Sequence, residues 1–132
     1  MIKVISILQS DGGILSFSIN LEGEYGGIKI SWSQGNLNGE VHAEDYFAGL
    51  IQVREIFSKK NIVVLCNGAR YDVYPSRMSR QMSKGIKAYA LTLGRQTSQA
   101  DLVDIFGLAD LNKIGTPQQQ KDYYEKWLNS LV

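Results

Sequence analysis

The chain has 132 residues, with 14 Lys and Arg side chains, 13 Asp and Glu side chains, one histidine and one cysteine. A chain of this length predicts a single globular domain over residues 1–132, which can bury about two-thirds of its unfolded surface without a disulfide or a metal staple. One cysteine excludes an internal disulfide and a multi-cysteine zinc site, and 44% hydrophobic residues exclude a disordered chain. The start of the chain is too short and too polar for a signal peptide, and no apolar run approaches the roughly 18 residues of a membrane helix. We therefore expect a cytoplasmic protein with no membrane partner.

Three segments near the N-terminus have the patterns of β-strands. Residues 2–9 are apolar and rich in β-branched side chains, and residues 14–21 and 28–33 alternate apolar with polar side chains. Turn chemistry separates the strands at Asp11-Gly12-Gly13 and again between Glu22 and Gly27. These patterns predict a three-stranded antiparallel meander.

The next segment has apolar side chains at helical spacing and predicts a helix near residues 43–59. Acidic residues at its start and lysines at its end complement the helix dipole. The expected apolar stripe consists of Phe47, Leu50, Ile51 and Phe57.

A strand is predicted at residues 62–66, which lack a polar face, and another at residues 85–93. Residues 102–106 are predicted to form a short strand, with a helical turn after Ser98 as the alternative. A second helix should begin after Thr116, a good N-cap, and continue through Trp127 and Leu131 at helical spacing. The fold class is therefore α+β: a largely antiparallel sheet, with the N-terminal meander and further strands, packed by two main helices.

Catalytic candidates are few. His42, which we place at the start of the first helix, would have to serve any triad, and Cys66 ends an apolar strand where cysteine behaves as a small apolar residue. No His, Cys or carboxylate pair repeats at metal spacing, and the glycine runs match neither a P-loop nor a dinucleotide fingerprint. We expect no enzyme activity, no cofactor and no metal, with a small enzyme centred on His42 as the weakest of three hypotheses.

The charge is unevenly distributed along the chain. Residues 1–58 carry 3 basic and 7 acidic side chains, residues 59–96 carry 8 basic and 1 acidic, and residues 97–132 carry 3 basic and 5 acidic. A local basic block favours an anionic partner, either nucleic acid or an acidic protein face. The alternative interpretation is a solvated surface whose charges are offset by neighbouring acids in the fold.

The most informative stretch lies inside the basic block, between Asn67 and Lys87. It follows an apolar strand and concentrates Tyr, Arg and Met, the residue types favoured at binding hot spots. Pro75 interrupts it, so residues 76–83 are either a loop or a short helical turn. In the alternative interpretation the aromatic side chains pack beneath the loop. The predicted partner-binding residues are Arg70, Tyr71, Asp72, Tyr74, Arg77, Met78, Arg80 and Met82.

Two other surfaces remain open at this point. Residues 59–96 could bind nucleic acid, with arginines and lysines on phosphates and tyrosines stacking on bases, but the pI of about 7.8 is low for such a domain. The acidic N-terminal part could instead be the face that meets a basic protein. Its candidate residues are Glu22, Glu24, Glu40, Glu44 and Asp45.

Residues 61–106 resemble a family of small bacterial immunity proteins found in contact-dependent growth inhibition and other polymorphic toxin systems. The resemblance rests on VYPSRMSRQM followed by KAY, within the segment that begins VLCNGARYD and is followed by LVDIF. The chain departs from that pattern at Arg77 and at Ser83-Lys84, where glycines are common in the family. The resemblance implies a non-enzymatic antitoxin that binds the C-terminal toxin domain of its own system, often a nuclease acting in the cytoplasm, with nucleic acid not a direct partner.

Overall fold

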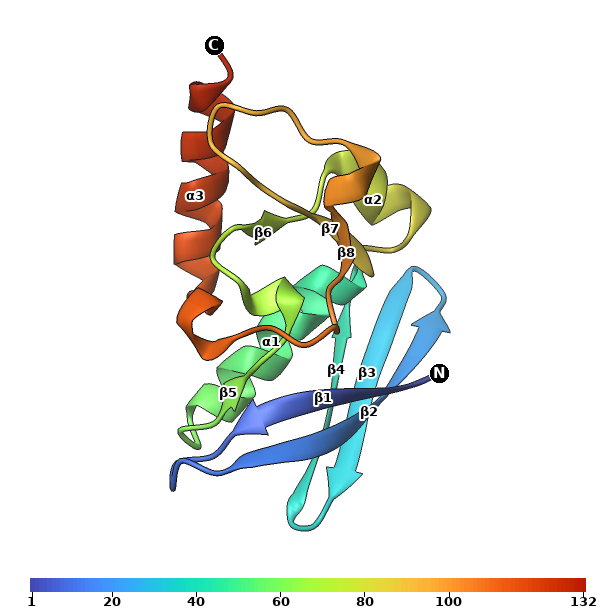
Figure 1. Ribbon diagram of the computed structural model, residues 1–132. Coiled ribbons are helices and arrows are strands. Elements are labelled where there is room, and N and C mark those ends of the chain that lie inside the picture. The colour runs from blue at the N-terminus through green and yellow to red at the C-terminus, as the bar shows by residue number, and fades with distance from the viewer.

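The computed structural model describes residues 1–132 and consists of two sheets with three α-helices (Figure 1). Four consecutive antiparallel strands joined by tight turns form most of the first sheet, and the short β5 adds to the far side of β1, giving the order β4-β3-β2-β1-β5. The strands are β1 Ile2–Leu8, β2 Ile14–Glu24, β3 Gly27–Gln34, β4 Leu37–Ala43 and β5 Val63–Val64.

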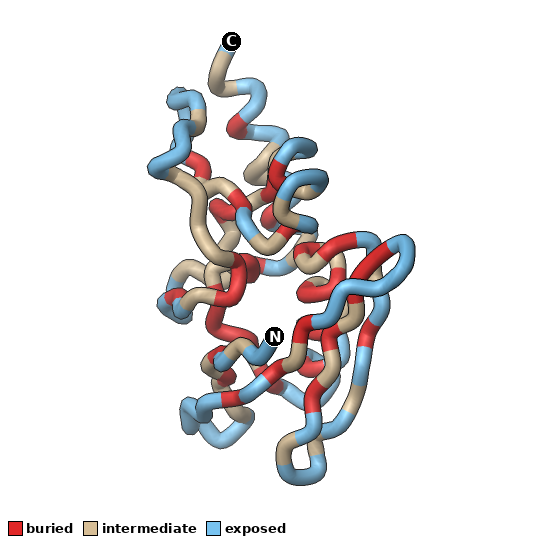
Figure 2. The backbone as a smooth tube through the Cα atoms, turned by 90° about the vertical axis from the view of Figure 1, so that its right-hand side faces the viewer, coloured by how far each residue is buried: buried red, intermediate tan, exposed pale blue.

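Helix α1, Tyr46–Ser58, covers one face of this sheet and forms the core with it. Phe47, Leu50 and Phe57 of the predicted apolar stripe are buried, whereas Ile51 is half-buried. The ring of Phe57 meets the rings of Phe17 and Trp32 edge-on, each with a centroid separation of 5.5 Å. The opposite face of the sheet carries the polar members of each alternation, and buried and exposed residues alternate along these strands (Figure 2).

The fourth strand was not predicted, and this corrects two sequence expectations. His42 lies on β4 instead of at the helix start, and α1 begins at Tyr46 instead of residue 43. Gly39 pairs with Trp32 across the β3–β4 ladder, and a Cβ at residue 39 would lie only 2.6 Å from the indole ring. A glycine in mid-strand weakens the strand signal in sequence, but here it makes room for a buried tryptophan.

The second sheet is antiparallel in the order β6-β7-β8 and consists of β6 Val73–Tyr74, β7 Lys87–Ala90 and β8 Leu102–Asp104. Strand β7 is shorter than the strand predicted at residues 85–93. The strand predicted at residues 62–66 is reduced to β5, but Ile62, Leu65 and Cys66 are buried as expected. Three short 3₁₀ turns connect these parts: η1 Asn67–Ala69, η2 Gln99–Asp101 and η3 Leu111–Lys113. Both alternatives at residue 98 are therefore present, a helical turn followed by a strand.

Helix α3, Pro117–Ser130, begins as predicted, with Thr116 and Gln119 forming a reciprocal capping box. It packs on β6 of the second sheet. Trp127 is buried and donates its indole N–H to the Arg95 carbonyl oxygen, 2.9 Å away. The predicted α+β class with a largely antiparallel sheet is confirmed. None of the helices combines the length and the apolar character needed to cross a membrane.

Candidate functional site

The segment from Asn67 to Lys87 separates into a buried part and an exposed part. Arg70 forms a bidentate ion pair with the buried Asp72, with both N···O distances 2.9 Å, and Lys113 approaches the same carboxylate at 3.8 Å. Because these charges are paired inside the fold, Arg70 and Asp72 are components of the scaffold. Their prediction as partner-binding residues is not supported by their placement.

The two tyrosines of this segment also pack internally. Tyr74 stacks on Tyr124 of α3 with a centroid separation of 4.5 Å and meets Phe47 edge-on at 5.5 Å. Tyr71 lies edge-on to Tyr123 at 5.2 Å. The alternative interpretation, aromatic side chains packed beneath the loop, therefore describes both residues better than a partner-binding role.

Helix α2, Arg77–Met82, is the short helical turn that the sequence left open after Pro75. The side chain of Ser76 caps its first turn by accepting from the Ser79 N–H at 3.0 Å. Arg80 reaches back to α1, where it forms an ion pair with Asp45 at 2.8 Å and lies over the Phe47 ring, 5.3 Å from its centroid. These contacts hold α2 in one position against the start of α1.

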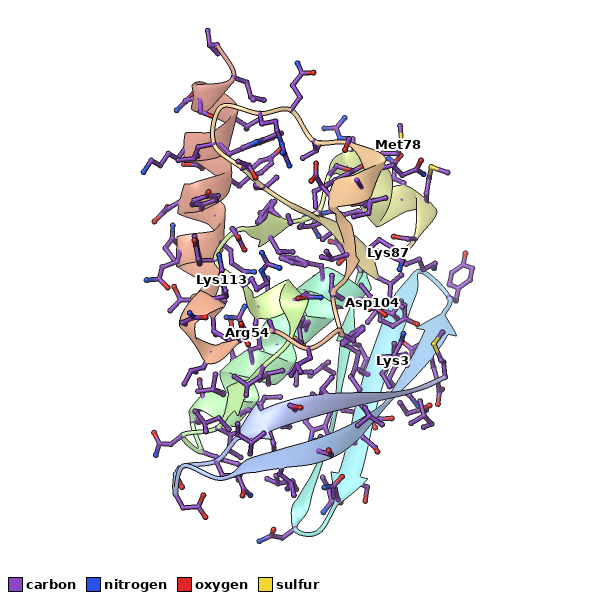
Figure 3. All side chains as sticks on the ribbon, viewed as in Figure 1. Lys3, Arg54, Met78, Lys87, Asp104 and Lys113 are labelled. Carbon is purple, nitrogen blue, oxygen red and sulfur yellow. The ribbon has the colours of Figure 1, made fainter.

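The outward side of α2 is the exposed part of the segment. Met78 and Met82, one helical turn apart, are 66% and 80% exposed, and Arg77 is exposed beside them. Two exposed lysines follow, and none of the three cations forms a salt bridge. Met78 projects away from the body of the protein, and Lys87 lies below α2 on β7 (Figure 3). We name Arg77, Met78, Met82, Lys84 and Lys87 the α2 surface.

The predicted acidic residues also separate into two groups. Asp45 is buried, because it caps α1 by accepting from the Ala48 N–H at 2.8 Å and pairs with Arg80, so its place on an exposed acidic face is corrected. Glu44 is exposed in the connection between β4 and α1. The remaining three residues lie on the outer sheet face, on the two strands β2 and β4 that flank β3, and we name them the acidic face: Glu22, Glu24 and Glu40.

Cations embedded in the acidic face offset most of its charge. Lys29 approaches Glu22 at 3.5 Å, and His42 contacts Glu24 through Nδ1 at 2.9 Å and Glu40 through Nε2 at 2.6 Å. Carboxylates only accept hydrogen bonds, so both ring nitrogens of His42 must donate, which requires the protonated ring. The hydrogen bonds to Glu24 and then Glu40 raise the pKa of His42 above its ordinary value of 6.5. With His42 protonated, two cations face three carboxylates.

The basic block does not form one continuous stripe. Arg70, Arg80 and Arg95 are paired with carboxylates. Of the remaining cations, Lys59 and Lys60 follow the end of α1, whereas the α2 surface lies at its beginning. A helix of 13 residues separates these groups by about 20 Å. A single-stranded nucleic acid would therefore not meet an unbroken row of phosphate-binding side chains here.

Neither catalytic candidate lies in a reactive arrangement. His42 is held between two glutamates, and Cys66 is fully buried, where burial raises the pKa of its thiol to about 12. A nucleophilic cysteine needs a thiolate near neutral pH, which this environment opposes. No group of three or more His, Cys, Asp and Glu side chains is placed to hold a metal ion.

No protein-family model matches the chain, and no curated protein matches it. Function is therefore inferred from the geometry of the two surfaces. Of the eight predicted partner-binding residues, the structure leaves Arg77, Met78 and Met82 on an open surface. Lys84 and Lys87, which the sequence assigned only to the nucleic-acid alternative, lie near them because α2 turns the chain back into β7.

Proposed function

We propose that this protein neutralises a bacterial toxin domain in the cytoplasm by binding it through the α2 surface, without an enzymatic step of its own. The observation that carries the proposal is the exposure of Met78 and Met82 on a helix locked to the core by the Arg80–Asp45 pair. Methionine side chains adapt to irregular apolar pockets, and a rigid support lowers the entropy lost on binding.

The balance of charges favours the α2 surface over the acidic face. Arg77 and Lys84 have no carboxylate partner, and the carboxylate of Asp104, opposite Lys87 in the β7–β8 pair, is already bound by Lys3, so a net positive field remains available to a binding protein. The glutamates of the acidic face already contact Lys29 and His42, which reduces the attraction that they exert on a cationic partner.

The sign of the α2 surface restricts how a toxin would be bound. A nuclease needs cations where it holds phosphates, and a basic inhibitor surface would be repelled there. The expected contact is an apolar pocket rimmed by carboxylates, so a nuclease toxin would be bound beside its nucleic-acid cleft and not across it.

The test requires a toxin-like domain encoded beside the gene for this protein and compares matched variants by surface plasmon resonance, which measures both affinity and association rate. The Met78→Ala/Met82→Ala double variant should weaken binding by on the order of 100-fold, because truncation of two anchors costs about 1–2 kcal/mol each. Arg77→Glu should slow association about tenfold at low salt. The Glu22→Gln/Glu40→Gln variant is the control and should bind within about twofold of the parent.

The proposal is overturned if the Glu22→Gln/Glu40→Gln variant loses toxin binding while the Met78→Ala/Met82→Ala variant keeps the parent's affinity. That outcome would place the contact on the acidic face. The second candidate function is nucleic-acid binding by Arg77, Lys84 and Lys87, none of which forms a salt bridge. It predicts binding to tRNA whose affinity falls with salt at a slope of about −0.7 to −0.9 per phosphate contacted. Filter binding at two salt concentrations measures that slope.

A further inference from the structure

One arginine differs from the other half-buried arginines of this protein. Arg70 and Arg80 each pair with a carboxylate, whereas Arg54 of α1 forms no salt bridge although it is half-buried. Arg54 lies in the region between α1 and the start of α3 (Figure 3). A cation removed from water without a counter-ion costs free energy, and burial lowers the pKa of Arg54.

The guanidinium group is only partly engaged by the protein. Nη1 donates to Oε1 of Gln120 at 2.8 Å, and Nη2 donates to the carbonyl oxygen of Gly115. A guanidinium has five N–H donors, so three of them, including Nε–H, have no acceptor in the protein. No fully buried side-chain nitrogen lacks a hydrogen-bond partner, so Nε must reach solvent.

These free donors belong to a residue that lines a cleft of about 330 Å³ between α1, β5 and the start of α3. Ile62, Val63 and Ile114 give the cleft an apolar lining, to which Ser58 and Thr116 add two hydroxyl groups. Glu55 also lines it and brings one negative charge to the site. The cleft therefore combines an apolar lining with one cation that forms no salt bridge.

We propose that this cleft binds a carboxylate that carries an apolar substituent, with the carboxylate on the free N–H groups of Arg54. A planar guanidinium with free N–H donors can bind a carboxylate through two parallel hydrogen bonds. Glu55 repels a dianion more strongly than a monoanion, which favours a carboxylate over a phosphate. Ile62, Val63 and Ile114 then accommodate the apolar group.

A purely structural role explains only part of Arg54. Gln120 is buried, and its amide nitrogen donates to the carbonyl oxygens of Gly68, Arg70 and Val73, so its Oε1 needs a donor. A neutral donor would satisfy Oε1 equally well. The contact with Gln120 does not explain why this residue is charged or why three of its donors are free, whereas a bound carboxylate would use both.

The experiment follows the Nε–H resonance of Arg54 in a nitrogen–proton correlation spectrum during titration of the intact protein. The probe is 4-methylpentanoate, and its control is the isosteric amide, 4-methylpentanamide, each added to about 10 mM. We expect a saturable shift of the Arg54 resonance with the carboxylate and none with the amide. Equal shifts with both compounds, or a shift with neither, would overturn the proposal.

Substitution of Arg54 would remove its contacts to α3, so the matched variants change the exposed Ser58 instead. Ser58→Glu places a carboxylate in the cleft and should weaken the probe at least about fivefold relative to Ser58→Gln. Equal affinity in the two variants would refute the site. N-acetyl-alanyl-leucine distinguishes the sources: tighter binding than 4-methylpentanoate identifies a peptide C-terminus as ligand, and weaker binding identifies a free organic acid. This site is independent of toxin binding, so either proposal can fail alone.

Discussion

The α2 surface and the acidic face carry opposite charges, and they differ most in how those charges are compensated. On the acidic face, Lys29 and His42 lie among the three glutamates, within 3.5 Å of a carboxylate oxygen. At α2, the acid that could have played that part, Asp45, is buried and used to anchor Arg80. Ion pairing, and not the number of charged residues in a segment, therefore decides which surface is open to a partner.

The largest effect should come from Asp45→Ala, because Asp45 both caps α1 and anchors α2. Loss of the cap costs about 1 kcal/mol, and loss of the half-buried ion pair adds about 1–2 kcal/mol, so the free energy of unfolding should fall by about 2–3 kcal/mol. Glu44→Ala, the exposed neighbour, should change it by less than about 0.5 kcal/mol. Urea unfolding of both variants measures the difference, and equal effects would show that α2 is not held through Asp45.

A smaller difference is expected between two glycines with positive φ, one at each surface. Gly85, with φ +75°, follows α2, and a Cβ there would lie 3.1 Å from Cγ of Asp45. Gly26, with φ +80°, lies in the β2–β3 turn beside the acidic face, where a Cβ would have no atom within 4 Å. Gly26→Ala should cost about 1 kcal/mol from backbone strain alone, and Gly85→Ala about 2 kcal/mol because crowding adds to it. Thermal unfolding compares the two variants. An equal loss of stability would mean that α2 and Asp45 shift to relieve the crowding at residue 85.

The smallest effect concerns the pH dependence of the acidic face. The pKa of His42 is raised in the folded protein, first by Glu24 and then by Glu40, so its ion pairs stabilise the fold fully below about pH 6.5. That contribution is lost as the pH rises through the higher folded pKa. The stability difference between the parent and His42→Gln should therefore shrink over the same interval, and the ring-proton shift of His42 gives its midpoint.

The same titration distinguishes the two surfaces in a binding measurement. Deprotonation of His42 leaves the acidic face more negative and leaves the α2 surface unchanged, so toxin affinity should not follow the His42 midpoint. An affinity that changes with that midpoint would place the acidic face inside the interface.

Features that depend on near neighbours in the chain could be predicted from the sequence alone. The alternation at residues 14–21 and 28–33 specified the meander, and the Thr116, Pro117 and Gln119 pattern specified the start of α3, because a strand's two faces and a helix cap are set within a few residues.

Which charged and aromatic residues are free depends instead on the folded arrangement. Arg80 meets Asp45 across 35 positions of the chain, Gln120 reaches Gly68 across 52, and Trp32 covers Gly39 of a strand whose sequence pattern is weak. Arg54 is left without a counter-ion for the same reason. Such pairings form between segments that folding brings together, so residue type and local spacing do not specify them.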